Sequence, residues 1–263
     1  MGLNSIIKKA FGEKGLQGLA PGTVDFFNEQ KAIINRKPLL KKSYLNFYSS
    51  FKSDLATVPV ITNGKVLELG SGGGFLKDYL PNTITSDVYD KVADLKIDAR
   101  DLPFENGEVR AIFMASVLHH IPNVKAFFRE ADRVLCNGGI CAIVEPCNTP
   151  FARFFYTKLH HEPFLPDTGN WEFIQDDSML DSNQALSWIV FERDLDVFRR
   201  EFPNLIIEKK YFFSTLEYFF SGGVNYRPLV PSFMYGFITF LSRILRPLDR
   251  FSSLAWYVLI RKN

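Results

Sequence analysis

The sequence carries almost no net charge, because 31 lysines and arginines are balanced by 29 aspartates and glutamates. A protein that binds nucleic acid through its phosphates needs a surplus of cations, so this balance argues against such a partner. Long apolar runs are missing from the start of the chain, where residues 1–10 contain Lys8 and Lys9. With no secretory signal visible, we expect a cytoplasmic protein.

Cysteine is also scarce. The three cysteines, Cys136, Cys141 and Cys147, are odd in number and match neither a zinc-finger nor a CxxC spacing. We therefore expect reduced thiols, and no metal is expected. By contrast, 46% of the residues are hydrophobic and 26 are phenylalanine. This apolar content excludes a disordered chain and predicts a sizeable core.

Short apolar segments alternate with helical ones from residue 64 onward. The predicted strands are 65–69, 83–86, 93–97, 109–115 and 140–145, and the predicted helices between them are 75–80 and 123–135. This alternation is typical of a doubly wound α/β domain with a parallel sheet. A helix at 194–202 and a pair of strands at 205–213 and 254–260 follow.

The first predicted strand ends in the glycine-rich loop 70–74, which places bare backbone at the carboxyl end of the sheet. The dinucleotide fingerprint G-x-G-x-x-G needs a third glycine where Phe75 stands. A nicotinamide-dependent oxidoreductase is therefore a disfavoured alternative.

Acidic residues stand at successive strand ends. Glu68 precedes the glycine loop, Asp87 ends the second strand, and Asp98 ends the third. Because the carboxyl ends of parallel strands meet at one edge of a sheet, these side chains should line one ligand site. A carboxylate at Asp87 could accept both hydroxyls of a ribose, and Asp98 with the backbone of Ala99 could contact an adenine edge.

These motifs resemble the class I S-adenosylmethionine-dependent methyltransferases, and among them the small-molecule type of the ubiquinone and menaquinone group. The resemblance rests on the segments 66–74, 98–104, 116–121 and 133–139. It implies a Rossmann-like methyltransferase fold, with a mostly parallel seven-stranded sheet, an aromatic-rich helical cap and S-adenosylmethionine as cofactor.

The resemblance also implies which residues hold the cofactor. The glycine loop would lie beside its methionine part, with Glu68 at the amino group and Asp87 at the ribose. The complete implied set is Glu68, Gly70, Ser71, Gly72, Gly74, Asp87, Val88, Asp98, Ala99, Ala115 and Ser116.

Methyl transfer from a sulfonium is an in-line displacement, so much of the catalysis is positioning. A hydroxyl acceptor would benefit from a general base. His119 and His120 follow Ser116 by three and four positions, and on a helix they would return to its face. Either these histidines hydrogen-bond within the fold, or one is the base, for which His120 is preferred. Glu145, at the end of the fifth strand, is a second candidate expected to face the same cleft.

The segment after the fifth strand is rich in aromatic residues and histidine. We expect His160, His161, Tyr156 and Trp171 to contact the acceptor, while a metal site at the adjacent histidines is conceivable but disfavoured. An aromatic cap suits a partly apolar small molecule or a lipid- or glycan-linked acceptor, methylated at oxygen. The alternative is a catalytically inactive methyltransferase-fold binding module.

We divide the chain into four regions. Residues 1–63 form an N-terminal helical lid, 64–146 the cofactor-binding core, 147–204 the acceptor-side insertion, and 205–263 the last strands with an apolar helical insertion at about 228–250. The predicted helix at 43–55 either packs on the sheet or covers the cleft.

The apolar segment 231–247 is too short to span a bilayer, because at about 1.5 Å per residue it falls short of the ~30 Å core. Two alternatives remain open. The segment is buried or lies in a dimer interface, or it makes a membrane-surface contact through 231–250 with Arg243, Arg246 and Arg250 at the headgroups. The oligomeric state is open.

Overall fold

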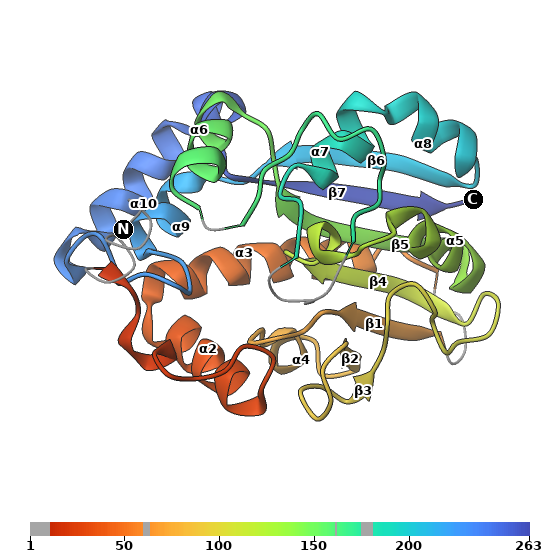
Figure 1. Cartoon of the computed structure of the whole chain (residues 1–263), viewed down its shortest axis with the longest axis horizontal. Helices are drawn as coiled ribbons and strands as arrows, with labels where there is room; N and C mark the ends of the chain where they lie inside the picture. Colours follow the sequence, from red (N-terminus) through yellow and green to blue (C-terminus); the bar gives the residue numbers. More distant parts are fainter. Residues whose placement is uncertain (1–10, 60–63, 161, 175–180) are drawn as a thin grey trace.

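The computed structural model describes residues 11–59, 64–160, 162–174 and 181–263. Its centre is a seven-stranded sheet with the strand order β3-β2-β1-β4-β5-β7-β6. The strands are β1 (Lys65–Leu69), β2 (Thr83–Asp87), β3 (Leu95–Lys96), β4 (Val109–Ala115), β5 (Leu135–Pro146), β6 (Leu205–Phe212) and β7 (Ala255–Lys262). Neighbours from β3 to β5 pair in parallel, and β7 runs antiparallel to both β5 and β6. The predicted α/β fold with a mostly parallel sheet is confirmed (Figure 1).

Helices cover both faces of this sheet (Figure 1). They are α2 (Val24–Arg36), α3 (Pro38–Leu55), α4 (Leu76–Tyr79), α5 (Val124–Val134), α6 (Pro150–Lys158), α7 (Leu186–Trp188), α8 (Leu195–Glu201), α9 (Thr215–Ser221), α10 (Tyr235–Ile244) and α11 (Asp249–Ser252). Several of these helices are capped at their first turn by a short polar side chain. Asn123 accepts the backbone N–H of Ala126 at the start of α5, and Thr149 accepts that of Ala152 at the start of α6. These caps satisfy amides that the helices leave without an internal partner.

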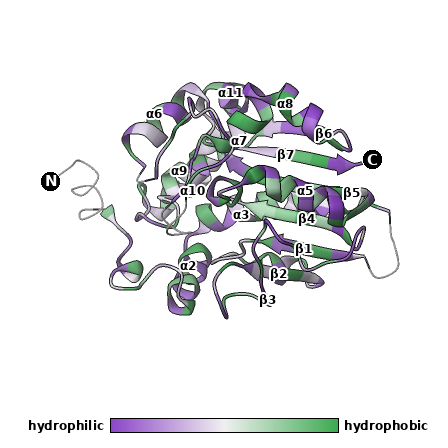
Figure 2. Ribbon diagram, turned by 45° about the vertical axis from the view of Figure 1, so that its right-hand side comes forward, coloured by the Kyte–Doolittle hydropathy of each residue, from purple (hydrophilic) through white to green (hydrophobic). Residues whose placement is uncertain are grey.

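The core lies on both sides of the sheet. Phe113 of β4 packs against Phe51 of α3 on one side, with ring centroids 4.7 Å apart. Ile112 and Met114 belong to the core on the other side, which includes α5. Because both faces of β4 are covered, its residues 111–115 are continuously apolar rather than alternating, and green stretches mark the central strands in Figure 2. The helix predicted at 43–55 therefore packs on the sheet, which was the first of the two alternatives.

Two strands differ from their predicted bounds. β5 begins at Leu135, five residues before the predicted start, because the chain bulges between its pairing with Val109 and its pairing with Ala111. Gly138 adopts a left-handed φ of +77° in this bulge, a conformation open to glycine. β3 is reduced to Leu95–Lys96 at the edge of the sheet.

The apolar segment near residue 240 is not buried in this chain. In α10 the buried residues are Ile238 and Ser242, and the Ser242 hydroxyl donates to the Glu217 carboxylate of α9 at 2.5 Å. The exposed apolar side chains, named here the 233–251 face, are Phe233, Phe237, Phe240, Ile244, Leu245, Leu248 and Phe251. The alternative that the segment is buried within this chain is therefore wrong, whereas the dimer-interface and membrane-surface alternatives stay predictions. Over the part of the chain that the structure describes, every helix is too short or too polar to cross a membrane.

Candidate active site

A pocket of ≈ 880 Å³ opens at the carboxyl ends of β1, β2 and β4. Its walls contain most of the residues that the sequence singled out: Glu68, Gly70, Ser71, Gly72, Gly74, Asp87, Val88, Asp98, Ala99, Ala115, Ser116, His119, His120, Tyr156 and His160. Glu145 and Trp171 lie elsewhere, as described below, and His161 is outside the described residues.

The glycine loop is shaped by close contacts. Gly70 has a φ of +63°, and a Cβ there would lie 2.5 Å from Cγ2 of Val117. At Gly74 a Cβ would lie 2.8 Å from the carbonyl oxygen of Ser71. Side chains are therefore excluded at these two positions, and the loop presents bare backbone to the pocket.

Asp87 ties this loop to the second strand. Its Oδ2 accepts the backbone N–H of Gly72 at 3.0 Å, and its Oδ1 accepts that of Tyr89 at 3.2 Å. Burial raises the pKa of this carboxyl, and the backbone donors partly offset the effect. The carboxyl group thus stands fixed in the pocket wall, where its remaining lone pairs can accept further hydrogen bonds.

Glu68 is an acid of the pocket whose pKa is strongly raised. It is 5% exposed, and burial raises its pKa to about 8 despite a hydrogen bond with Ser71 that lowers it. At neutral pH the carboxyl group is therefore largely protonated in the empty pocket. A cationic amino group bound beside it would favour the ionised form, so the site suits such a ligand.

Asp98 and Arg100 form a bidentate ion pair at the opposite wall. Nε and Nη2 of Arg100 donate to the Asp98 carboxylate at 2.9 and 2.6 Å. This guanidinium lowers the pKa of Asp98, so the acid stays ionised. Ala99 lies between the two charges and is buried against the pocket.

The chain turns sharply after β4. Ser116 has a φ of +60°, a conformation that costs a non-glycine residue free energy, and its N–H donates to Val144 of β5 at 2.8 Å. The next residues form a 3₁₀ turn, η2 (Leu118–His120), not an α-helix. The prediction that His119 and His120 share a helical face with Ser116 is therefore wrong, although all three line the pocket.

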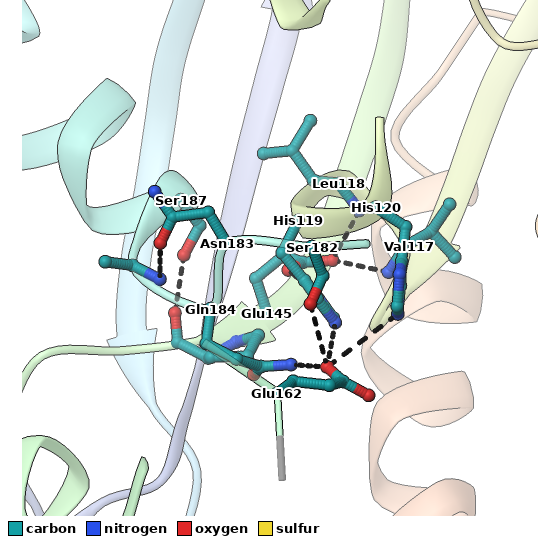
Figure 3. A network of polar contacts seen from close by, with 12 residues as sticks. Val117, Leu118, His119, His120, Glu145, Glu162, Ser182, Asn183, Gln184 and Ser187 are labelled. Carbon is teal, nitrogen blue, oxygen red and sulfur yellow. Dashed lines mark hydrogen bonds and ion pairs between the residues drawn. The ribbon is translucent and has the colours of Figure 1, made fainter. Parts of the chain in front are cut away.

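Glu145 lies behind the pocket wall, where it is fully buried. Its Oε1 accepts the N–H groups of Val117 and Leu118 at 2.6 and 2.7 Å, and its Oε2 accepts Nδ1–H of His119 at 2.6 Å (Figure 3). The expectation that Glu145 faces the cleft is thus wrong, because these contacts turn its carboxylate toward η2. Glu145 positions the turn and the His119 ring.

Glu162 meets both histidines from the other side (Figure 3). Its Oε2 lies 3.5 Å from Nε2 of His119 and 3.9 Å from Nε2 of His120. The Ser182 hydroxyl and the Gln184 amide also donate to this oxygen. We name these three residues, His119, His120 and Glu162, the histidine–glutamate cluster.

The two histidines of this cluster are held in different charge states. Burial disfavours the charged form of His119, but Glu145 and Glu162 outweigh it and raise its pKa to about 10. Burial and the neighbouring His119 lower the pKa of His120 to about 4. At neutral pH the cluster therefore combines an imidazolium, a neutral imidazole and a carboxylate.

The acceptor-side predictions have mixed outcomes. Tyr156 lines the pocket, and its hydroxyl donates to the carbonyl of Leu254 at 2.9 Å. Trp171 is 2% exposed and its indole donates to Asp194 at 2.9 Å, so it belongs to the core rather than to the pocket. Sequence reasoning missed the pocket roles of Gln184 and Tyr218, which come from segments with no motif of their own.

Comparison with known proteins agrees with this geometry. Residues 67–143 match the family model described as a methyltransferase domain. The fold is similar to geranyl diphosphate C-methyltransferase from Streptomyces coelicolor, solved with Mg²⁺, geranyl diphosphate and S-adenosyl-L-homocysteine; the TM-score is 0.53 at 14% identity, over 96% of this chain and 90% of that one. It is also similar to a chain in the complex of the Haloferax volcanii Trm112 activator with a methyltransferase; the TM-score is 0.51 at 13% identity, over 90% of this chain and 94% of that one. A search of proteins with curated function gives no match.

Proposed function

Since the chain is a class I S-adenosylmethionine-dependent methyltransferase, we propose that it methylates a hydroxyl group of a small, partly apolar acceptor. The observation that carries this proposal is the composition of the pocket. Its polar end holds the histidine–glutamate cluster, and its other walls include Phe155, Leu159, Tyr218 and Phe219. An acceptor with an apolar body and one polar group fits such a site.

The cofactor-binding roles rest on charge and backbone placement. S-adenosylmethionine supplies a methyl group on a positively charged sulfur. In our proposal Glu68 takes its amino group, Asp87 its ribose hydroxyls, and Asp98 with Ala99 its adenine. The raised pKa of Glu68 supports this assignment, because that buried carboxyl needs a cationic partner to ionise.

The reaction breaks the sulfur–methyl bond and forms an oxygen–methyl bond, while the acceptor hydroxyl loses its proton. We propose that Nε2 of His120 takes this proton. The ring is neutral at neutral pH, and its Nδ1 lies 3.3 Å from the carbonyl oxygen of Asp181, which fixes the Nδ1–H tautomer. The proton then passes to solvent, because the pocket wall at His120 is partly exposed.

Replacing His120 with alanine should lower turnover by about 10²–10⁴-fold and leave cofactor affinity almost unchanged. The measurement is transfer of labelled methyl from S-adenosylmethionine to a panel of phenols, quinols and glycolipids, with calorimetric titration of the cofactor in parallel. An unchanged turnover number would mean that a residue other than His120 is the base. Loss of cofactor binding would instead mean that His120 shapes the cofactor site.

The N-terminal segment closes one side of the pocket, and we propose that it acts as the lid. Residues 11–13 and 16–19 together with Phe26 and Phe27 line the pocket. Lys37, buried at the start of α3, pairs with Glu13 at 2.9 Å and donates to the carbonyl of Gly223 at 2.9 Å. One lysine thus joins the N-terminal segment to the loop after α9, and both of these segments line the pocket.

The 233–251 face supports a proposal on how the acceptor arrives: we propose that this face lies on an anionic membrane surface. Its seven exposed apolar side chains alternate with the exposed Arg243, Arg246 and Arg250. The acid nearest in sequence, Asp249, is buried. Apolar groups with interspersed cations are complementary to anionic headgroups over acyl chains. Leu229, four residues before this face in the sequence, lines the pocket and is 45% exposed.

The double variant Phe237→Ser/Phe240→Ser should abolish sedimentation with vesicles of anionic phospholipid, while the wild type sediments and is released by salt. Ile174→Ser is the matched control, because Ile174 is 88% exposed outside this face. If the wild type does not sediment with these vesicles, the membrane proposal is refuted, and the methyl-transfer proposal is unaffected. Self-association of the wild type, lost in the double variant, would assign the face to a dimer instead.

A further inference from the structure

We propose that the histidine–glutamate cluster binds one divalent transition-metal ion through Nε2 of His119, Nε2 of His120 and a carboxylate oxygen of Glu162, and that the Nε2 proton of His119 is released to solvent when the ion binds. These three atoms lie within 4.8 Å of one another. The two nitrogens are 3.5 and 3.9 Å from the same oxygen, Oε2 of Glu162. Ligands at about 2.1 Å from a zinc-like ion stand about 3–3.5 Å apart, so only a small inward movement is needed.

The outer contacts of the cluster support a metal site. Nδ1 of His119 donates to the Glu145 carboxylate at 2.6 Å, and Nδ1 of His120 lies 3.3 Å from the backbone carbonyl of Asp181. Each ring thus directs its second nitrogen, Nε2, toward Glu162. A carboxylate or carbonyl that fixes the far nitrogen of a histidine is the usual arrangement around metal-binding histidines.

The outer contacts also fix the carboxylate. The Ser182 hydroxyl and the Gln184 amide both donate to Oε2 of Glu162 (Figure 3). Glu145 is itself held by two backbone amides, so the support of His119 is rigid. These five side chains, at positions 119, 145, 162, 182 and 184, come from parts of the chain far apart in the sequence, and the fold brings them together.

The donor set selects the class of ion. Two imidazole nitrogens and one carboxylate suit Zn²⁺, Mn²⁺ or Fe²⁺, whereas Mg²⁺ prefers oxygen ligands alone. All three residues line the pocket, so further coordination positions would face the acceptor. A charge of +2 would also offset the carboxylates of the buried Glu145 and the half-buried Glu162.

This inference rests on the proposed methyl transfer to a hydroxyl group, and it replaces His120 as the proposed base with a metal ion. An ion in this place would bind the acceptor oxygen and lower the pKa of the hydroxyl, which then releases its proton to solvent. Nε2 of His120 would be a metal ligand rather than the base. The two roles therefore exclude each other, and metal binding can be measured without any acceptor.

The test is titration of the metal-depleted full chain, free of affinity tag, with Zn²⁺, Mn²⁺ and Mg²⁺. We expect one Zn²⁺ per chain, weaker Mn²⁺ binding and no measurable Mg²⁺ binding. Glu162→Gln and His120→Asn should each weaken Zn²⁺ binding at least tenfold. Glu105→Gln is the matched control for Glu162→Gln, because it makes the same change at an exposed glutamate outside the pocket, and it should keep the affinity.

Substitution with Co²⁺ gives a second readout, since nitrogen–oxygen coordination produces visible absorption bands that both ligand variants should lose. Equal Zn²⁺ affinity in the wild type and both variants, or no binding, would overturn the inference. A parallel titration with S-adenosylmethionine tests the proposed function separately from the metal site. Cofactor binding without metal binding refutes only the metal site, whereas metal binding without cofactor binding refutes the proposed function.

Discussion

Glu68→Gln is expected to weaken S-adenosylmethionine binding at least tenfold and at the same time to stabilise the empty protein at pH 8. The first effect follows because a neutral amide cannot pair with the amino group of the cofactor. The second follows because burial raises the pKa of Glu68 to about 8, so its ionised form opposes folding. One substitution should therefore move affinity and stability in opposite directions.

The sign of the pH dependence follows from linkage. Below the ordinary pKa of a glutamate, both the folded and the unfolded chain hold the proton, and Glu68 has no effect on stability. Between that value and about 8, the unfolded chain loses its proton while the folded chain keeps it, so wild-type stability falls as the pH rises. Glutamine has no proton to lose. The stability gain of the variant should thus grow from pH 5 to pH 8, to an order of about 1–3 kcal/mol.

Thermal unfolding of both proteins between about pH 5 and pH 9, with cofactor titration at each pH, checks this prediction. Glu105→Gln, which changes an exposed acid, should alter neither quantity. A stability difference that does not vary with pH would mean that Glu68 is ionised throughout. If Glu68→Gln binds S-adenosylmethionine with unchanged affinity, the amino group of the cofactor does not contact Glu68.

Glu145→Ala should lower the free energy of unfolding by about 3–5 kcal/mol. The substitution leaves the buried N–H groups of Val117 and Leu118 without an acceptor and removes the partner that stabilises the His119 imidazolium. Glu145→Gln should cost less, because an amide oxygen can still accept the backbone N–H groups. Urea unfolding followed by circular dichroism measures both changes.

Glu208→Ala is the matched control for this experiment. Glu208 is also a strand glutamate with a close partner, Arg261 at 2.6 Å, but it is exposed. Exposed ion pairs contribute about 0–1 kcal/mol, so its removal should shift the midpoint only slightly. If Glu145→Ala behaves like Glu208→Ala, Glu145 does not hold the turn that carries His119.

Some predictions could be made from the sequence because their physical causes are local. The strand at 109–115 matches β4, since a fully covered strand needs a continuous apolar run. The helix at 123–135 matches α5 to within a residue, since Asn123 caps it. The glycine loop and the acids at strand ends were placed at one pocket for a topological reason: parallel strands all end at the same edge.

Other features depend on contacts between segments far apart in the chain. Helical periodicity shows that α10 has an apolar side, but not whether that side meets the core or solvent. Its polar Ser242 turns inward because Glu217 of α9 accepts its hydroxyl, and the phenylalanines are left outside. The hydrophobic pattern alone therefore does not predict which side of α10 is buried.

The α/β fold and the position of the pocket could thus be predicted from the sequence itself, because the glycine loop and the strand-end acids follow strands that all end at one edge of the sheet. The histidine–glutamate cluster was decided only by the tertiary structure. Ser116 breaks the expected helix, Glu145 turns away from the pocket to hold His119, and Glu162 arrives from more than 40 residues further along the chain. A sequence pattern has no means of giving the direction of a buried carboxylate, because that direction is set by its hydrogen-bond donors in space.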